Sequence, residues 1–293
     1  MIKLIASDMD GTLLNDKMAV SDRNIQAIKN AQKAGIEFLI ATGRSLEEAK
    51  PFLKDRVHPG YITLNGAEIY DKDENLISSN PISESSKIKV INYLKEHQIY
   101  FEVVTNKGIF SDNKDMRVTS LAELLVKLNP STTYEQALAD TMERIKLTPM
   151  TFVDSYDKIL SDPSYQIMKL LAFSNKEQEV LGPLRADIEK NIKDVVVTSS
   201  SPNNVEINSI DAQKGIALLQ YAKDKNITQD QTMAIGDNLN DESMIRDAGI
   251  GVAMQNAIPA IKDLSDITTD NNVNDGVAQI VEEVINKGDD FTK

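Results

Sequence analysis

The chain has 293 residues and a formal net charge of -13, with 41% hydrophobic and 26% charged residues. This length allows one large domain or two ordinary ones, and the negative charge disfavours nucleic-acid or anionic-membrane partners because phosphate groups repel it. Cysteine is absent, which excludes disulfides, thiolate zinc sites and a thiol nucleophile.

The first expected strand ends on two carboxylates. Residues 2–6 form an apolar run that is too short for a buried helix and is typical of an interior strand of a parallel sheet. Asp8 and Asp10 follow it, and residues two apart on an extended chain point the same way, so they can share one small site. Such a pair is stable when a cation lies between the acids or when one of them holds a proton. Gly11 permits a sharp turn and Thr12 adds a hydroxyl, although an ordinary acidic turn would look the same.

The next segment predicts a β-α-β unit. Ser21 is a candidate N-cap for a helix that ends at Gly35, and residues 36–41 form a second apolar strand. This strand ends on Thr42-Gly43-Arg44. A hydroxyl and free backbone N–H groups at a strand-to-helix turn form an anion cradle, although an ordinary loop that contains an arginine would have the same sequence.

A third strand is expected over residues 61–64, and a hairpin over residues 67–78. The third strand ends on Asn65-Gly66, at the same edge as the earlier motifs. Asn65 therefore either contacts the site or only forms a turn.

The chain between residues 82 and 200 predicts a second domain. Its expected helices span residues 83–97, 120–128, 134–142 and 176–191, and its expected strands span residues 99–105, 166–173 and 195–198. These elements carry no chemically suggestive residues at the strand ends, which indicates an α+β domain inserted into the first one. The predicted core therefore comprises residues 1–81 and 201–293, with residues 199–204 as the return. His58 and His97 lie in no triad context, so the serines of the return are not candidate nucleophiles.

Two further motifs follow in the C-terminal part of the core. Lys214 lies just before an expected helix, where it could reach an anion or remain a surface lysine. Residues 231–235 predict a buried strand that ends on a second acidic group, Asp237 to Asp241. A helix at 242–248, a strand at 249–253 and a helix at 280–286 complete the parallel-sheet pattern.

Polar residues at the predicted sheet edge come from four places in the sequence: Asp8 with Asp10, Thr42, Lys214, and Asp237 with Asp241. If they all lie at the carboxyl edge of one parallel sheet, they form an acidic pocket with one cation and one anion cradle. Such a pocket suits a metal ion and a phosphate group.

The same residues resemble a known family. Asp8–Thr12, Thr42–Arg44, Lys214-Gly215 and Gly236–Asp241 resemble, in order and spacing, the four signatures of the haloacid dehalogenase-like phosphatases. The long insertion is similar to that of the Cof-type branch with a large α/β cap, subfamily IIB. The resemblance implies an α/β fold with a Rossmann-like parallel-sheet core and an inserted α+β cap domain. It also implies Mg²⁺-dependent hydrolysis of small phosphorylated metabolites, sugar phosphates above all, through an aspartyl-phosphate.

The resemblance further implies roles for individual residues. Asp8 would be the nucleophile and a metal ligand, Asp10 the general acid and base and a metal ligand through its backbone carbonyl, and Asp237 the third protein ligand. The phosphoryl oxygens would be bound by Thr42, Gly43 and Lys214. Supporting positions are expected at Thr12, Arg44, Asn65, Asn240 and Asp241.

Two other functions are compatible with these residues. A phosphotransferase or mutase would pass the phosphoryl group from the same intermediate to a sugar hydroxyl, and a non-catalytic phospho-receiver would also surround a Mg²⁺-bound aspartate with acids, Thr and Lys. An acid two residues after the nucleophile favours turnover over a long-lived phosphorylated state.

The expected partner is a small phosphorylated metabolite rather than a nucleic acid or a membrane, and the expected assembly is a monomer or weak homodimer. Too few apolar residues follow Lys3 for a signal peptide, and no apolar run approaches membrane-spanning length, so we expect a cytoplasmic protein.

Overall fold

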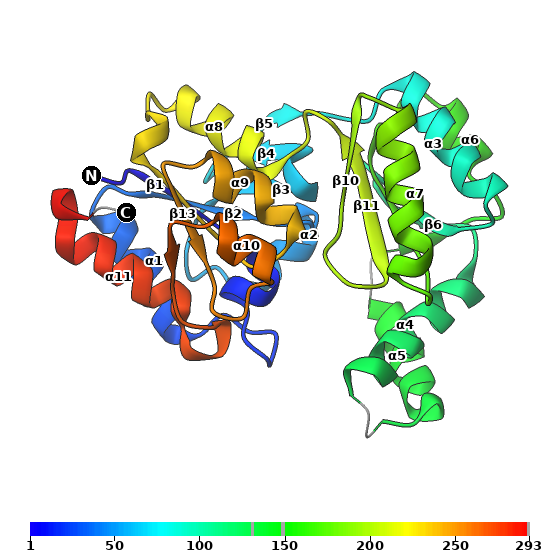
Figure 1. The fold of residues 1–293 in the computed structure, drawn as a ribbon, viewed down its shortest axis with the longest axis horizontal. Coiled ribbons are helices and arrows are strands. Elements are labelled where there is room, and N and C mark those ends of the chain that lie inside the picture. Colours follow the sequence, from blue (N-terminus) through cyan, green and yellow to red (C-terminus); the bar gives the residue numbers. More distant parts are fainter. Residues whose placement is uncertain (130–131, 148–149, 292–293) are drawn as a thin grey trace. The chain divides into compact units, whose positions relative to one another are not determined.

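The protein divides into two compact units in a computed structural model that describes residues 1–129, 132–147 and 150–291 (Figure 1). The first unit comprises Met1–Asn80 and Asp211–Lys293, and the second comprises Pro81–Ile210. The predicted domains also include residues 130–131, 148–149 and 292–293, which lie outside the described residues.

A largely parallel sheet forms the centre of the first unit, with the strand order β14-β13-β12-β1-β2-β3-β4-β5. Its strands are β1 (Leu4–Ser7), β2 (Glu37–Ala41), β3 (Gly60–Thr63), β4 (Glu68–Tyr70), β5 (Leu76–Ser79), β12 (Thr232–Gly236), β13 (Ile250–Ala253) and β14 (Ile267–Thr268). Two pairs in this sheet are antiparallel, β3 with β4 and β4 with β5. The buried strand β1 lies between β12 and β2 and is parallel to both, so the three strands end at one edge of the sheet.

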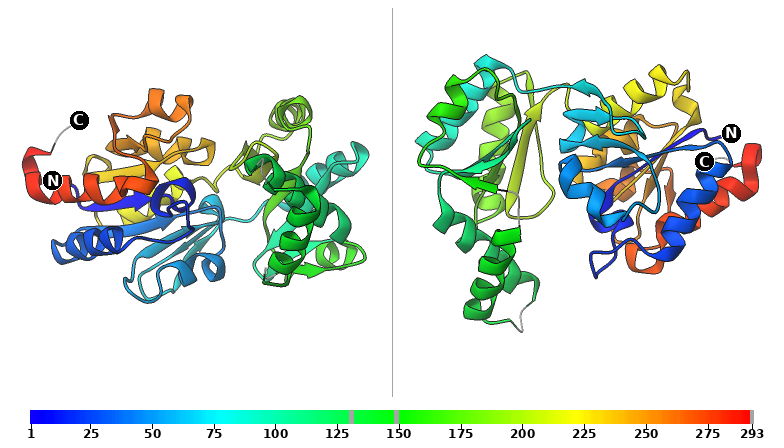
Figure 2. Two further views of the ribbon diagram at one scale, coloured as in Figure 1. Left: turned by 90° about the horizontal axis from the view of Figure 1, so that it is seen from below. Right: turned by 180° about the vertical axis from the view of Figure 1, so that it is seen from behind.

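Helices cover both faces of this sheet (Figures 1 and 2). They are α1 (Asp22–Lys33), α2 (Leu46–Ala49), α8 (Lys214–Asp224), α9 (Glu242–Asp247), α10 (Pro259–Leu264) and α11 (Gly276–Lys287). Helices α1 and α11 pack against each other on one face, and α8, α9 and α10 pack on the other. Ser21 caps α1 as predicted, because its hydroxyl accepts a hydrogen bond from the Asn24 N–H at 3.0 Å.

The second unit contains a separate, mostly antiparallel sheet with the strand order β10-β11-β9-β6-β7-β8. Its strands are β6 (Tyr100–Thr105), β7 (Gly108–Ser111), β8 (Met150–Phe152), β9 (Ile167–Phe173), β10 (Val195–Thr198) and β11 (Asn204–Ser209). Its helices are α3 (Glu84–Glu96), α4 (Lys114–Leu128), α5 (Tyr134–Leu147), α6 (Asp157–Ser161) and α7 (Gln178–Asn191). Helices α3 and α7 bury an apolar core against one face, and α4 and α5 pack together as a pair (Figure 2).

The predicted fold class, a Rossmann-like parallel core with a second α+β domain, is confirmed. The return to the first unit lies at Asp211 rather than at residue 201, because β11 pairs with both β9 and β10. This strand carries buried polar residues on one face, such as Glu206, whose carboxylate binds Lys169 at 3.2 Å. Because of those polar residues, the segment lacks the apolar run by which the other strands were predicted. Helix α4 also begins at Lys114, six residues before the predicted start at 120, and β7 and β8 were not predicted.

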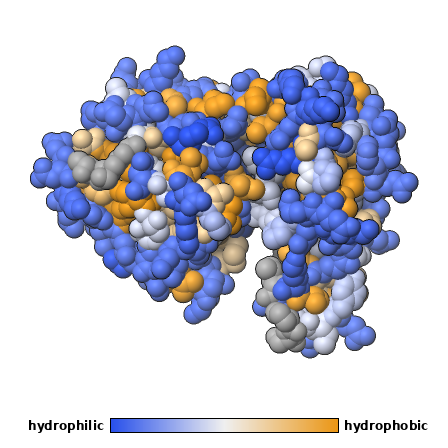
Figure 3. All heavy atoms as spheres, viewed as in Figure 1, coloured by the Kyte–Doolittle hydropathy of each residue, from blue (hydrophilic) through white to orange (hydrophobic). Residues whose placement is uncertain are grey.

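Hydrophilic residues cover much of the visible surface of both units (Figure 3). Among the residues that the structure describes, no helix is both long enough and apolar enough to cross a bilayer.

Candidate active site

Three neighbouring strands of the first unit lead into polar residues at one edge of the sheet. Strand β1 is followed by Asp8, β2 by Thr42 and β12 by Asp237. Ser7 lies beside Ile40 of β2 and Ile235 of β12 in the parallel register, so the three strand ends are level with one another. This edge is where ligands bind in open α/β sheets.

A buried acidic cluster occupies this edge. Carboxylate oxygens of Asp8, Asp237 and Asp241 all lie within 4.8 Å of one another. The Lys214 ammonium donates to Oδ1 of Asp8 and to Oδ1 of Asp241, each at 2.6 Å. Lys214 is only 1% exposed and Asp241 is fully buried. Three carboxylates beside one ammonium leave excess negative charge in a buried place, which favours protonation or a bound cation.

Burial and mutual repulsion shift the pKa values of these groups. Burial raises the pKa of Asp8 well above its usual range, and the charge of Asp241 raises it further. The same two causes raise the pKa of Asp237 to about 7. Burial acts to lower the pKa of Lys214, but the charges of Asp241 and Asp8 outweigh it and raise that pKa above its ordinary value. Lys214 therefore stays charged, while Asp8 and Asp237 resist full ionisation.

Asp241 is held by hydrogen bonds on both of its oxygens. Oδ1 accepts from Lys214, and Oδ2 accepts from the backbone N–H groups of Asp237 and Asn238 at 2.8 and 3.1 Å. Asp241 therefore orients the lysine and closes the turn after β12. Asp237 is held differently, because its Oδ1 accepts a hydrogen bond from the Thr12 hydroxyl at 2.7 Å.

The turn after Asp8 requires a glycine. Gly11 has a φ of +83°, and a Cβ at this position would lie 2.5 Å from Oδ2 of Asp237. The side-chain amide of Asn256 donates to the Gly11 carbonyl oxygen at 2.8 Å, and that of Asn272 donates to the Leu14 carbonyl oxygen at 2.8 Å. Neither asparagine was predicted from the sequence. Asn256 follows β13 near the same sheet edge, which was a usable signal, whereas Asn272 offered none.

Asp10 lies outside the acidic cluster and pairs with Arg44. The guanidinium donates from Nε to Oδ2 at 2.7 Å and from Nη2 to Oδ1 at 2.6 Å. The Asp10 side chain is 46% exposed, in contrast to the nearly buried Asp8. The two acids at the end of β1 therefore have different environments and different cationic partners.

The turn after β2 brings the remaining predicted residues together. Thr42 is fully buried, and its hydroxyl accepts from the Arg44 N–H at 3.2 Å, with Gly43 between the two in the chain. The Thr42 carbonyl accepts from the Asn65 N–H at 3.0 Å. Asn240 donates to Oδ1 of Asn65 at 3.4 Å, which links this turn to the turn after β12.

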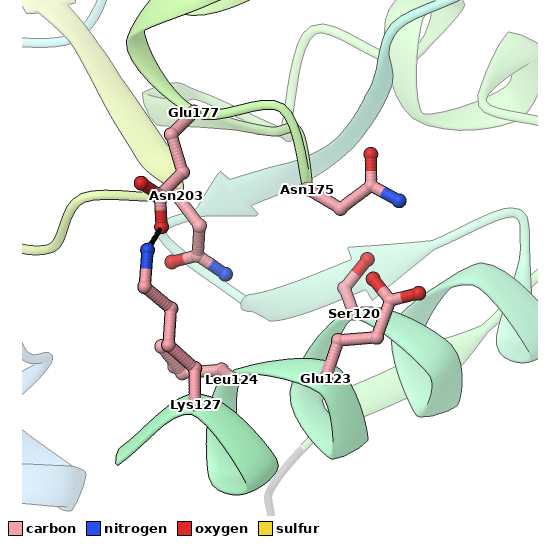
Figure 4. Close-up of a pocket in the computed structure, with 7 residues that line it drawn as sticks. All are labelled: Ser120, Glu123, Leu124, Lys127, Asn175, Glu177 and Asn203. Carbon is pink, nitrogen blue, oxygen red and sulfur yellow. Dashed lines mark hydrogen bonds and ion pairs between the residues drawn. The ribbon is translucent and has the colours of Figure 1, made fainter.

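The second unit has a small polar pocket of its own, with a volume of about 60 Å³ (Figure 4). It is lined by Ser120, Glu123, Leu124 and Lys127 of α4 and by Asn175, Glu177 and Asn203. Lys127 and Glu177 form an ion pair on one side of it. Hydroxyl, amide and carboxylate groups in one pocket can bind a ligand that carries hydroxyl groups.

The chain is similar in sequence and in fold to proteins of one known family. A family model described as haloacid dehalogenase-like hydrolase matches residues 5–281. The chain is 31% identical to phosphatase YwpJ of Bacillus subtilis strain 168, over 97% of this chain and 100% of that protein. It is 33% identical to the 5-amino-6-(5-phospho-D-ribitylamino)uracil phosphatase YwtE of the same strain, over 97% of this chain and 98% of that protein. A solved structure of a haloacid dehalogenase-like hydrolase from B. subtilis matches with a TM-score of 0.85 and 30% identity, over 97% of this chain and 100% of that one.

Proposed function

Because the chain belongs to the haloacid dehalogenase-like hydrolases and is a phosphatase of that family, we propose that it hydrolyses small phosphorylated metabolites with Mg²⁺. We propose that the reaction forms an aspartyl-phosphate on Asp8. The observation that carries the proposal is the environment of this carboxylate, which ends the central strand β1 and bonds the buried Lys214 at 2.6 Å. Two further carboxylates lie within 4.8 Å of it.

The residues at the site fit a magnesium ion. Among the described residues, the atoms of this cluster that could ligate a metal are carboxylate oxygens. Burial first, and the charge of Asp241 second, raise the pKa values of Asp8 and Asp237, so full ionisation of both acids calls for a bound cation. The carboxylates of Asp8 and Asp237 and the backbone carbonyl of Asp10 would hold the ion, since both oxygens of Asp241 already accept hydrogen bonds. When bound, Mg²⁺ supplies the charge that offsets repulsion between the acidic cluster and a phosphate dianion.

In the first step, an Asp8 carboxylate oxygen attacks phosphorus and the bond from phosphorus to the leaving oxygen breaks. Asp10 gives its proton to that departing alkoxide, so that a neutral alcohol leaves. Lys214, the Thr42 hydroxyl and the Gly43 N–H would bind the phosphoryl oxygens at the end of β2. The buried ammonium is suited to this task because its two carboxylate partners hold it in place.

In the second step, water attacks the phosphorus of the aspartyl-phosphate. Asp10, now a carboxylate, removes a proton from the water, and Asp8 leaves as a free carboxylate with inorganic phosphate as the product. The different environments of the two acids support this division of work, since the buried Asp8 faces Lys214 and the more exposed Asp10 can reach solvent.

For the substrate class, we propose a phosphate ester of a polyhydroxylated compound such as a sugar. The name of YwtE specifies a phosphoribitylamino substrate for that relative, which supports this class. The polar pocket of the second unit, with Ser120, Asn175 and Asn203, offers hydrogen-bonding partners for hydroxyl groups. We propose that the second unit serves as the cap and selects the substrate.

A phosphate-release screen tests the function. We expect release from some members of a panel of sugar phosphates, sugar-alcohol phosphates and pyridoxal phosphate in Mg²⁺, and none in excess EDTA. Asp8→Asn should release no phosphate while keeping a native circular dichroism spectrum, whereas the exposed Asp16→Asn should behave as the unaltered protein. Wild-type turnover by Asp8→Asn would refute the nucleophile. Accumulation of a phosphorylated acceptor alcohol in place of phosphate would identify a phosphotransferase.

A further inference from the structure

Arg44 holds the carboxylate of Asp10 through both of its oxygens. The two hydrogen bonds measure 2.7 and 2.6 Å and come from Nε and Nη2, which form one edge of the guanidinium. Such a two-point pair fixes the plane of the carboxylate as well as its position. Without it, a side chain that is 46% exposed would sample several rotamers.

Arg44 is itself fixed to the turn after β2. Its backbone N–H donates to the Thr42 hydroxyl at 3.2 Å, and its carbonyl oxygen accepts from the Leu64 N–H at 3.0 Å. Its guanidinium carbon lies 4.8 Å from the centre of the Phe52 ring, which supports the side chain from another side. The pair therefore ties Asp10 to the turn that carries Thr42.

We propose that Arg44 is a positioning residue that aims the Asp10 carboxylate at the reacting oxygens, rather than a phosphate-binding residue. Asp10 occupies one of the two guanidinium edges that could bind a phosphate at two points, and one face of the guanidinium lies over the Phe52 ring. This inference rests on the proposed function, because it takes Asp10 as the acid and base. It adds a residue on which both proton transfers depend, since the same side chain of Asp10 acts first as the acid and then as the base.

The test compares Arg44→Met and Arg44→Lys with the unaltered enzyme on a sugar phosphate found in the screen. A general acid or base contributes about 10²–10⁴-fold, so loss of its orientation should lower kcat by about 10–100-fold in Arg44→Met. Arg44→Lys should lie between, because lysine keeps the charge without the two-point geometry. The inhibition constant of inorganic phosphate should change by less than about threefold in both variants, since phosphate binding is assigned to other residues.

A double-mutant cycle separates positioning from a structural role. In the Asp10→Asn background, Arg44→Met should cause no further loss of kcat, because there is no longer a catalytic carboxylate to aim. Arg23→Met is the matched control: Arg23 makes the same two-point contact with Glu282 at 3.2 and 2.8 Å, but between α1 and α11. It should leave kcat unchanged.

Three results would overturn the inference. A raised phosphate inhibition constant and KM with unchanged kcat would make Arg44 a phosphate-binding residue. An equal loss from Arg44→Met with and without Asp10 would make its role structural, and Arg44→Lys permits the same comparison should Arg44→Met unfold. If the unaltered enzyme released phosphate from none of the substrates in the screen, the proposed function would be refuted, and this inference would fall with it.

Discussion

Replacing Lys214 with methionine removes the only cation that contacts the acidic cluster among the described residues. The substitution keeps the length and burial of the side chain but leaves Asp8 and Asp241 without their ammonium partner, with Asp237 still close to both. The repulsion among these carboxylates then acts without compensation. We expect a large loss of stability in the absence of metal.

The size of this loss follows from the burial of the partners. Removing one member of a buried ion pair costs about 3–5 kcal/mol. For domains of about 150–250 residues each kcal/mol lowers Tm by about 2–4 °C, so we expect a fall of roughly 6–20 °C in EDTA at pH 8.

The pH dependence has a definite sign. The raised pKa values of Asp8 and Asp237 mean that the folded protein binds more protons than the unfolded one, between the ordinary value of 3.8 and about 7. Stability without metal therefore falls as pH rises through this range. Because loss of Lys214 raises these pKa values further, the deficit of the variant should shrink as pH falls from 8 to 5. The lysine itself stays charged throughout, since its raised pKa lies far above this range.

The assay is thermal unfolding followed by circular dichroism, in EDTA and in Mg²⁺, at several pH values. Mg²⁺ should restore part of the lost stability, because it replaces the missing positive charge. Lys87→Met is the matched control: Lys87 is 2% exposed, but the side chain of its partner Glu84 is 79% exposed, so its removal leaves a solvated carboxylate. We expect a loss of at most about 1 kcal/mol there. Equal Tm values for Lys214→Met and the unaltered protein in EDTA at pH 8 would refute the reasoning.

Three further predictions concern the reaction. Asp237→Ala should raise the Mg²⁺ concentration for half-maximal activity at least ~10-fold, since it removes a ligand, and full activity in excess chelator would count against any metal role. Asp10→Asn should release nitrophenol from nitrophenyl phosphate in a burst approaching one equivalent of enzyme, followed by a slow steady rate, because nitrophenolate leaves without an acid while water still needs the base. Equal losses on nitrophenyl and sugar phosphates without a burst would show that Asp10 is not the acid and base. Glu123→Gln in the pocket of the second unit should change the kcat/KM ratio between two metabolites by about 5–10-fold, the worth of one hydrogen bond of ~1 kcal/mol. Glu135→Gln, at an exposed position, is the control for this variant. An unchanged kcat/KM ratio in Glu123→Gln would mean that the pocket does not determine which substrate is used.

The architecture of the first unit could be predicted from the sequence because its signals are local. Apolar runs such as residues 2–6 and 231–235 stop at polar residues, and a buried parallel strand needs no partner to be recognised in this way. The strands of the second unit were harder to predict from the sequence. Strand β11 is apolar on one face and carries Asn204, Glu206 and Asn208 on the other. Two of these buried polar residues find partners on the paired strand β9, where Glu206 binds Lys169 and Asn208 donates to the Met168 carbonyl oxygen. Burial of that kind depends on tertiary pairing.

The chemistry of the site divides in the same way. The sequence was enough to select the candidate site residues, because each follows a strand or begins a helix. They are Asp8, Asp10, Lys214 and Asp237. Which of them touch could not be read from their spacing: Lys214 meets an acid 206 positions earlier in the chain, and Asp10 pairs with Arg44 instead of joining the cluster. Ion pairs form where folding brings opposite charges within reach in a partly buried place, and only the packed sheet edge determines that distance.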